Sequence, residues 1–313
     1  MRLRTRWLGP VLAGGLLLLF VTIALAQAPG NIYLPIISKA EEPTPTPIPP
    51  PPTPPPGHMV EFRGLWVTRF DWMTASRPAT PATIDRIVDD AAYAGFNALL
   101  FQVRGEADAY YQSSLVPWGR RLTGTLGQPP SPLWDPLTHL ISRARERGLQ
   151  VHAYINVYPV WLGLGTPPNT NPEHLYHLLA NAHGISPDPE TGELRNHGVQ
   201  WDTNRNVVRG ASVYLRATPA SIFLDNHLLA VIHELVTKYD LDGIHLDHAR
   251  YAGSAYSCDP VSEAAYGASC FSGAGYADWQ RQQINGTVSK FYRALFEDPA
   301  LSAGLHVNLS AAV

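Results

Sequence analysis

The sequence lacks the patterns that mark several large classes of protein. No basic run occurs beyond the N-terminus and the net charge is −3, so the charge pattern does not indicate nucleic-acid binding. No glycine-rich dinucleotide fingerprint is present, which disfavours a doubly wound nucleotide-binding sheet. There are only two cysteines, and no CxxC or HxxxH pattern accompanies them, so neither a zinc site nor any other metal or cofactor is expected.

Residues 1–26 have the pattern of an export signal. Three arginines precede an apolar run from Leu8 to Leu25, and Ala24-Leu25-Ala26 fits a cleavage site. The apolar run is nearly long enough to span a bilayer, so an uncleaved anchor is the alternative. Either interpretation places the rest of the chain outside the cytoplasm, secreted or attached to the cell envelope. Loss of three of the 23 basic residues would change the net charge to 20 − 26 = −6.

A proline-rich linker is predicted at residues 27–57, ending in PTPTPIPPPPTPPPG. Such a segment favours polyproline II geometry at about 3.1 Å per residue, so residues 43–57 would reach ~45 Å. We interpret the linker as a tether to the cell wall or membrane, and residues 58–313 as the folded domain.

The two cysteines, Cys258 and Cys270, are close in the sequence. In an exported protein such a pair predicts a disulfide. Closing this short loop is worth about 3 kcal/mol in the chain-entropy description.

From residue 61 onward, strand and helix patterns alternate. The predicted strands are 61–69, 96–105, 149–158, 243–249 and 304–313, with helices between them at 81–94, 136–147, 174–182, 219–239 and 277–296. Alternation of this kind predicts an α/β fold with a parallel sheet, and here it favours a (β/α)8 TIM barrel. Only about five of the eight β/α units are present, so we expect a truncated barrel.

One predicted strand, GIHLDHARY, carries charge in a segment that is otherwise built to be buried. Because strand side chains alternate, His245 and Asp247 share the inner face, while His248 is expected on the other. A buried carboxylate is costly unless it is paired or used. The structural alternative is an ion pair between Asp247 and Arg250.

The same alternation predicts polar side chains on one face of the other strands. These are Gln102 and Arg104, followed by Glu106 and Asp108; His152, Tyr154 and Asn156; and Asn308. Polar residues at the carboxyl ends of barrel strands form active sites, although each could instead be structural. Further candidate sugar contacts are Arg250, Tyr251, Trp118 and Trp161.

Three segments, EFRGLWVT, FNALLFQVRGEADAYY and YDLDGIHLDHARY, occur in an order that resembles the bacterial glycosyl-hydrolase-like family 10 proteins, the DUF187 group. The resemblance implies a TIM barrel and glycosidase activity on bacterial cell-surface glycans, in some members peptidoglycan strands stripped of peptides. The family motifs fall on Gln102, Arg104 and Asp108; on His152, Tyr154 and Asn156; and on Asp242, His245 and Asp247. Many relatives carry a second Asp after the last motif, where this chain has His248.

Glycoside hydrolysis normally needs two carboxyl groups on either side of the bond. Asp247 is the first candidate. Glu106 and Asp108 are candidates for the second, and a strand beyond Val313 is the alternative source. The predicted strand 304–313 contains no carboxylate.

Two other functions remain open from the sequence. A metal-dependent polysaccharide deacetylase would use His245, Asp247 and His248, and a non-catalytic module would only bind cell-wall glycan. All three hypotheses name a polysaccharide as the partner, and none involves nucleic acid.

Overall fold

The computed structural model describes residues 61–73, 79–253, 256–271, 275–297 and 307–312. The predicted signal at 1–26 and linker at 27–57 lie outside these residues. Within them, no helix combines the length and apolar character needed to cross a membrane.

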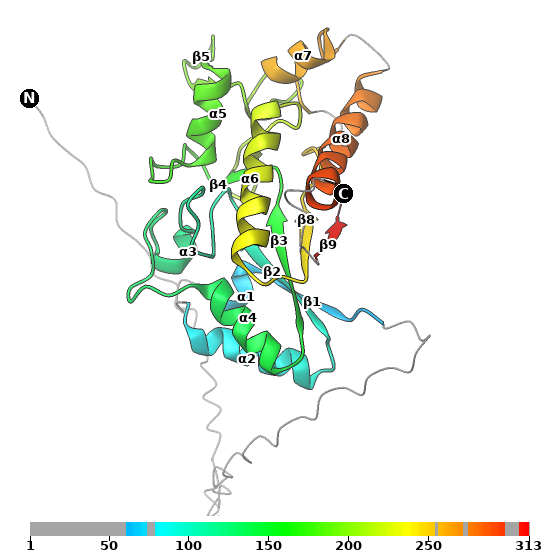
Figure 1. Ribbon diagram of the computed structural model, residues 1–313. Helices are drawn as coiled ribbons and strands as arrows, with labels where there is room; N and C mark the ends of the chain where they lie inside the picture. Colours follow the sequence, from blue (N-terminus) through cyan, green and yellow to red (C-terminus); the bar gives the residue numbers. More distant parts are fainter. Residues whose placement is uncertain (1–60, 74–78, 254–255, 272–274, 298–306, 313) are drawn as a thin grey trace, which may run out of the picture. The chain divides into compact units, whose positions relative to one another are not determined.

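Five parallel strands form the central sheet, in the order β1-β2-β3-β8-β9 (Figure 1). Their bounds are β1 Gly64–Val67, β2 Ala98–Arg104, β3 Gln150–Asn156, β8 Gly243–Asp247 and β9 Asn308–Ala311. All five predicted strands and the predicted parallel α/β architecture are therefore confirmed. The sheet is of TIM-barrel type but remains open, with β1 and β9 as its edges in the described part of the chain.

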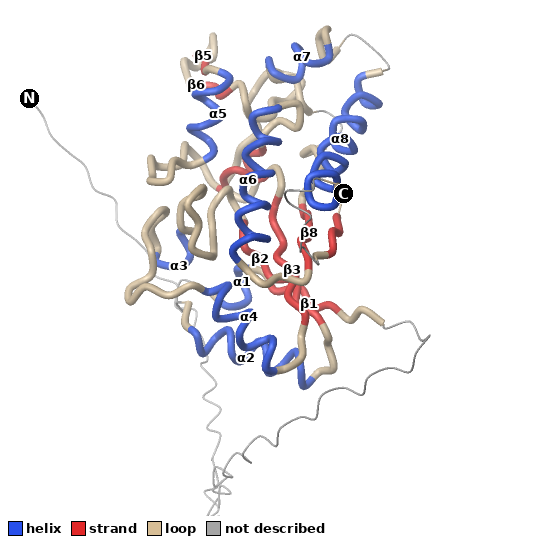
Figure 2. The backbone as a smooth tube through the Cα atoms, in the orientation of Figure 1, coloured by secondary structure: helices blue, strands red, loops and turns tan. Residues whose placement is uncertain are grey.

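Helices connect these strands (Figure 2). The described helices are α1 Arg69–Trp72, α2 Pro81–Tyr93, α3 Arg120–Thr123, α4 Pro136–Glu146, α5 Leu175–His183, α6 Ile222–Lys238, α7 Pro260–Tyr266 and α8 Tyr276–Phe296. Two small antiparallel pairs lie in the long β3–α6 connection: β4 Pro159–Leu162 with β7 Tyr214–Arg216, and β5 Ile185–Pro187 with β6 Leu194–Asn196. These pairs were not predicted.

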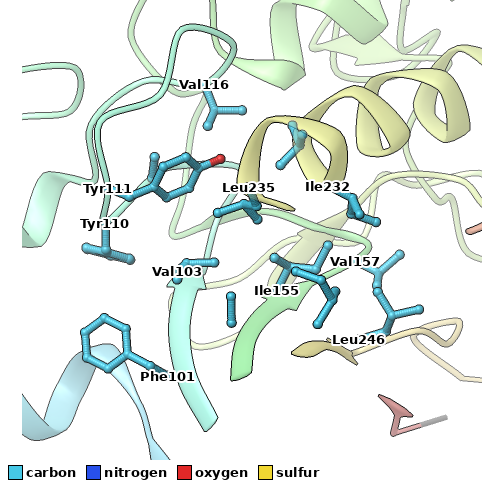
Figure 3. Packing of buried hydrophobic residues seen from close by; sticks show 14 of the residues in the cluster. Phe101, Val103, Tyr110, Tyr111, Val116, Ile155, Val157, Ile232, Leu235 and Leu246 are labelled. Carbon is cyan, nitrogen blue, oxygen red and sulfur yellow. The ribbon is translucent and has the colours of Figure 1, made fainter. Parts of the chain in front are cut away.

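The hydrophobic core lies between the sheet and its covering helices (Figure 3). Phe101 and Val103 of β2 and Ile155 of β3 face this side, and Ile232 and Leu235 of α6 pack against them. Fully burying one such side chain is worth about 1.5–3 kcal/mol. Alternation therefore leaves Gln102, Tyr154 and Asn156 of the same strands on the opposite face.

Side-chain caps set several helix ends. The Thr80 and Asp135 side chains accept amide hydrogen bonds at the starts of α2 and α4, each with proline in the first turn, as the sequence predicts. The Ser221 hydroxyl caps α6, so this helix starts after the predicted 219. The predicted strand 61–69 is too long because Thr68 caps α1.

Gly243 illustrates how tightly the polar face of the sheet packs. A Cβ atom at this position would lie 2.1 Å from His152 Nδ1. That separation is far below van der Waals contact, so the imidazole of β3 requires glycine at the start of β8.

A disulfide joins Cys258 and Cys270, with Cα atoms 5.4 Å apart, which confirms the predicted pairing. The linked segment follows β8 and contains α7. The Cys258 amide donates to the Trp201 carbonyl oxygen at 2.9 Å, which ties this segment to the β3–α6 connection.

Removing the disulfide in a Cys258→Ser, Cys270→Ser double variant is expected to lower the free energy of unfolding by about 3 kcal/mol, because the unfolded chain regains the loop entropy. Urea unfolding with and without dithiothreitol measures the loss. Dithiothreitol should destabilise the natural protein and leave the double variant unchanged. Equal midpoints for the oxidised natural protein and the double variant would contradict this expectation.

Candidate active site at the carboxyl ends of the strands

The sheet register stacks the polar residues in layers. His152 pairs with Gly243, Tyr154 with His245, and Asn156 with Asp247. The Asn156–Asp247 layer is at the carboxyl ends of the strands, where TIM-barrel enzymes place their active sites. We call this end of the sheet the rim.

Asp108 shapes the turn that follows β2. Its Oδ1 accepts the amide hydrogens of Gly105 at 3.0 Å and Glu106 at 2.8 Å, while Oδ2 accepts from the Tyr110 hydroxyl at 3.1 Å. Ala107 has a φ of +58°, so this turn costs backbone energy and depends on these bonds. Asp108 is buried, and its oxygens serve the turn.

Glu106 lies in a buried ion-pair network. Its carboxylate contacts Arg69 Nη2 at 3.2 Å and Arg120 Nη2 at 2.9 Å, and it accepts the Leu162 amide at 3.1 Å. Burial, followed by the nearby Asp108, raises the pKa of Glu106, while the two arginines oppose the rise. This carboxylate holds the loops of β1, β2 and β4 together.

Gln102 and Asn156 extend the network across the strands. Gln102 Oε1 accepts from the Arg69 amide at 3.0 Å and from Arg69 Nη1 at 3.1 Å. Gln102 Nε2 donates to Asn156 Oδ1 at 3.3 Å, and Asn156 Nδ2 donates to the Gly105 carbonyl at 3.0 Å. Both predicted residues meet at the rim, where they bind neighbouring loops.

The predicted position of Arg104, on the same polar face as Gln102, is wrong. A bulge in β2 pairs Gln102 with Tyr154 but Arg104 with Ile155, which faces the core. Arg104 therefore does not share a face with Gln102. It is fully buried and donates to the Asn156 and Val157 carbonyl oxygens. Burial lowers its pKa to about 10, and a substrate cannot reach its guanidinium in this conformation.

Asp247 ends β8 with an accessible carboxylate. Its side chain is 21 % exposed. Oδ1 accepts the amide hydrogen of His248 at 2.7 Å, and Oδ2 lies 3.9 Å from His248 Nε2. No ion pair with Arg250 occurs among the described contacts, and the Arg250 side chain is exposed.

Three residues missed by the sequence analysis join Asp247 to the Glu106 network. Arg216 Nη2 donates to His248 Nδ1 at 3.0 Å, and the Tyr214 ring lies 5.5 Å from the His248 ring. The Tyr214 hydroxyl accepts from Arg69 Nη2 at 2.7 Å. Tyr214 and Arg216 belong to β7, in a stretch with no regular hydrophobic period, and Arg69 was placed in a strand.

An aromatic layer lies below the rim. Trp66 contacts Tyr154 with ring centroids 4.8 Å apart and His245 at 4.7 Å, and it remains 43 % exposed. His245 Nδ1 lies 2.6 Å from Ser310 Oγ, and burial lowers the pKa of His245. Burial raises the pKa of Tyr154, and the Asp247 and Asp71 carboxylates reinforce this rise.

Several predicted residues lie away from Asp247. His152 and Asn308 are in the layer furthest from the rim, and Asn308 Nδ2 donates to the Asp242 carbonyl at 3.1 Å. Trp118 packs on the core, and Trp161 is covered by Arg120 at 4.4 Å. Neither tryptophan therefore presents an open ring face on which a sugar could stack.

Arg250 and Tyr251 instead border a cavity of about 370 Å³ between the loop after β8 and helix α8. The Tyr251 hydroxyl is buried without a hydrogen-bond partner in the described residues. Arg250 and Tyr251 stand three and four positions after Asp247 in the chain, and neither Asp247 nor His248 lines this cavity.

The residues named for a metal-dependent deacetylase make other contacts. His245 bonds Ser310 and His248 bonds Arg216. Across the described ranges, no three His, Cys, Asp or Glu side chains are grouped to hold a metal ion.

Comparison with known proteins identifies the family. The family model of glycosyl hydrolase-like 10 matches residues 61–297, which include the carboxyl ends of β1, β2, β3 and β8. The chain belongs to this family. The resemblance noted in the sequence is thereby confirmed.

Two curated relatives are similar to this chain over most of its length. Glycosyl hydrolase DigH of Escherichia coli K12 is 27 % identical over 244 residues, covering 73 % of this chain and 50 % of the relative. Glycosyl hydrolase YngK of Bacillus subtilis is 25 % identical over 248 residues, covering 75 % and 42 %. The chain thus spans half or less of the length of these relatives.

Solved structures support the fold. The glycoside hydrolase domain of PgaB (BpsB) from Bordetella bronchiseptica matches with a TM-score of 0.52 and 14 % identity, covering 80 % of this chain and 65 % of that domain. α-L-Fucosidase isoenzyme 2 from Paenibacillus thiaminolyticus matches with a TM-score of 0.51 and 16 % identity, covering 80 % and 32 %. Both structures share the barrel-type α/β fold with this chain, and the similarity extends to the fold alone.

Proposed function

We propose that this protein is an exported glycoside hydrolase that cleaves a bacterial cell-surface polysaccharide, with peptide-free peptidoglycan glycan strands as the substrate. Family membership supports the reaction class. The observation that carries the site assignment is the partly exposed Asp247 carboxylate at the carboxyl end of β8, with one oxygen not bonded to the backbone. A carboxylate in this position can act on a glycosidic bond as a base or nucleophile.

The second carboxyl group is the other part of the proposal. Glu106 and Asp108 are committed to the ion-pair network and to the turn after β2. Asp71 is our candidate, because it lies in α1, directly after the carboxyl end of β1, and the residue is exposed. Its Oδ2 also accepts the Thr68 amide at 2.6 Å, so the same side chain holds the start of α1.

Reducing ends released from purified peptide-free peptidoglycan glycans test this function. We expect release from this substrate, unchanged by EDTA because the proposed chemistry uses carboxyl groups. Heat-inactivated protein is the control. Release no faster than in this control would contradict the proposed activity, and loss of activity in EDTA that zinc restores would favour the deacetylase-type metal chemistry instead.

A further inference from the structure

His248 occupies an unusual backbone position directly after Asp247. Its φ is +52°, in the left-handed region that few residues other than glycine adopt. Strand alternation predicted that His248 would face away from Asp247. The left-handed turn instead places its Nε2 3.9 Å from Asp247 Oδ2, so the alternation ends with the strand. Backbone conformations of this kind cluster at functional sites.

The surroundings of His248 fix the position of its proton. Arg216 Nη2 lies 3.0 Å from Nδ1, and a guanidinium can only donate. Nδ1 must therefore accept, and the neutral imidazole carries its hydrogen on Nε2, facing Asp247.

The charged and titratable groups around the imidazole come from three segments. They are Asp247 and Arg250 beside it in the chain, Arg216 and Tyr214 on β7, and Arg69 on α1. Burial, the largest cause, and the three arginines lower the pKa of His248, while Asp247 opposes them. The neutral form is favoured near neutral pH.

The space between His248 and Asp247 suits one oxygen atom. A separation of 3.9 Å between Nε2 and Oδ2 is too long for a direct hydrogen bond. An oxygen at about 2.8 Å from each atom would bridge them. It must donate a proton to the carboxylate and accept one from Nε2–H, which a hydroxyl group or water can do and a glycosidic ether oxygen cannot.

We propose that Asp247 and His248 hold one hydroxyl-type oxygen between them, and that Arg216 is the positioning residue that fixes the tautomer of His248. The inference rests on the proposed function, because the oxygen belongs either to a sugar hydroxyl or to the water that attacks the glycosidic bond.

The tautomer can be measured without any glycan. Nitrogen-15 NMR of labelled protein is expected to show His248 with Nδ1 unprotonated and Nε2 protonated. Arg216→Met should mix the tautomers and raise the pKa of His248, because a donor and a positive charge are lost. Arg216→Lys should restore the Nε2–H form. A proton on Nδ1 in the natural protein, or no change in Arg216→Met, would overturn the inference whether or not the protein hydrolyses glycan.

Kinetics on peptide-free peptidoglycan tetrasaccharide test the held oxygen. His248→Phe and Arg216→Met should each lower kcat/KM about tenfold, the effect of one lost hydrogen bond. A rise in KM assigns the oxygen to a sugar hydroxyl, and a fall in kcat assigns it to the attacking water. An unchanged kcat/KM in both variants refutes the assignment.

Calorimetric binding separates this inference from the proposed function. If the natural protein binds the tetrasaccharide without cleaving it and His248→Phe weakens that binding, the hydrolase proposal fails and the held hydroxyl stands. If the natural protein and His248→Phe bind the tetrasaccharide equally and neither cleaves it, both the hydrolase proposal and the held oxygen are refuted.

Discussion

Replacing Asp247 by asparagine should lower the turnover of peptide-free peptidoglycan glycan by about 10³-fold, in the range expected for loss of a general acid or base. Asparagine keeps the shape of the side chain and its acceptor for the His248 amide. It cannot take up a proton or form a glycosyl ester. Reducing-end release measured against natural protein gives the ratio of rates.

Asp240→Asn is a matched control for this substitution. Asp240 precedes β8, its side chain is 82 % exposed, and among the described residues its carboxylate pairs with Arg145 at the surface. The control should keep nearly all activity, since exposed ion pairs contribute about 0–1 kcal/mol to stability. Comparable activity in Asp247→Asn and the natural protein would remove Asp247 from the mechanism, and comparable loss in both variants would point to general destabilisation.

Glu106→Gln should instead act through stability, lowering the free energy of unfolding by about 3 kcal/mol. The substitution removes the anion from a buried site that Arg69 shares, and the guanidinium of Arg69 is only 1 % exposed. Gln102 and Tyr214 remain as its hydrogen-bond acceptors but carry no charge. Urea unfolding of the natural and variant proteins measures the difference.

Glu263→Gln provides the comparison for Glu106→Gln. Glu263 also pairs with an arginine, Arg205, at 2.9 Å, but that arginine is 43 % exposed. Solvent screens this pair, so the expected loss is below about 1 kcal/mol. Equal losses in the two variants would contradict a special role for the buried network. A stable Glu106→Gln protein that has lost its hydrolytic activity would return Glu106 to the list of catalytic candidates.

The strands and their inner faces could be predicted because simple periodicities determine them. Tyr154 and Asn156 alternate with core residues of β3, and His245 and Asp247 do so on β8, so a period of two placed all four on the polar face. The side chains of Thr80 and Asp135 accept hydrogen bonds from helix amides, and these capping residues likewise made the starts of α2 and α4 predictable. These features depend on residues close together in the chain.

The missed features depend on contacts between distant segments or on local departures from regular backbone. Arg104 changes face because of a bulge in β2, and His248 turns back because of its positive φ. Arg216 reaches the site from β7, 32 residues away in the sequence. No periodic pattern encodes such a contact. The hydrogen bond from Arg216 to His248 could therefore be recognised only from the folded structure.

A crystal structure of Asp247→Asn protein with bound peptide-free peptidoglycan tetrasaccharide tests the central claim most directly. We predict that a sugar ring lies at the rim, with one of its oxygens within hydrogen-bond distance of both residue 247 and His248. A glycan bound at the N-terminal ends of the strands, or on the helix-covered side of the sheet, would contradict the assignment of the active site.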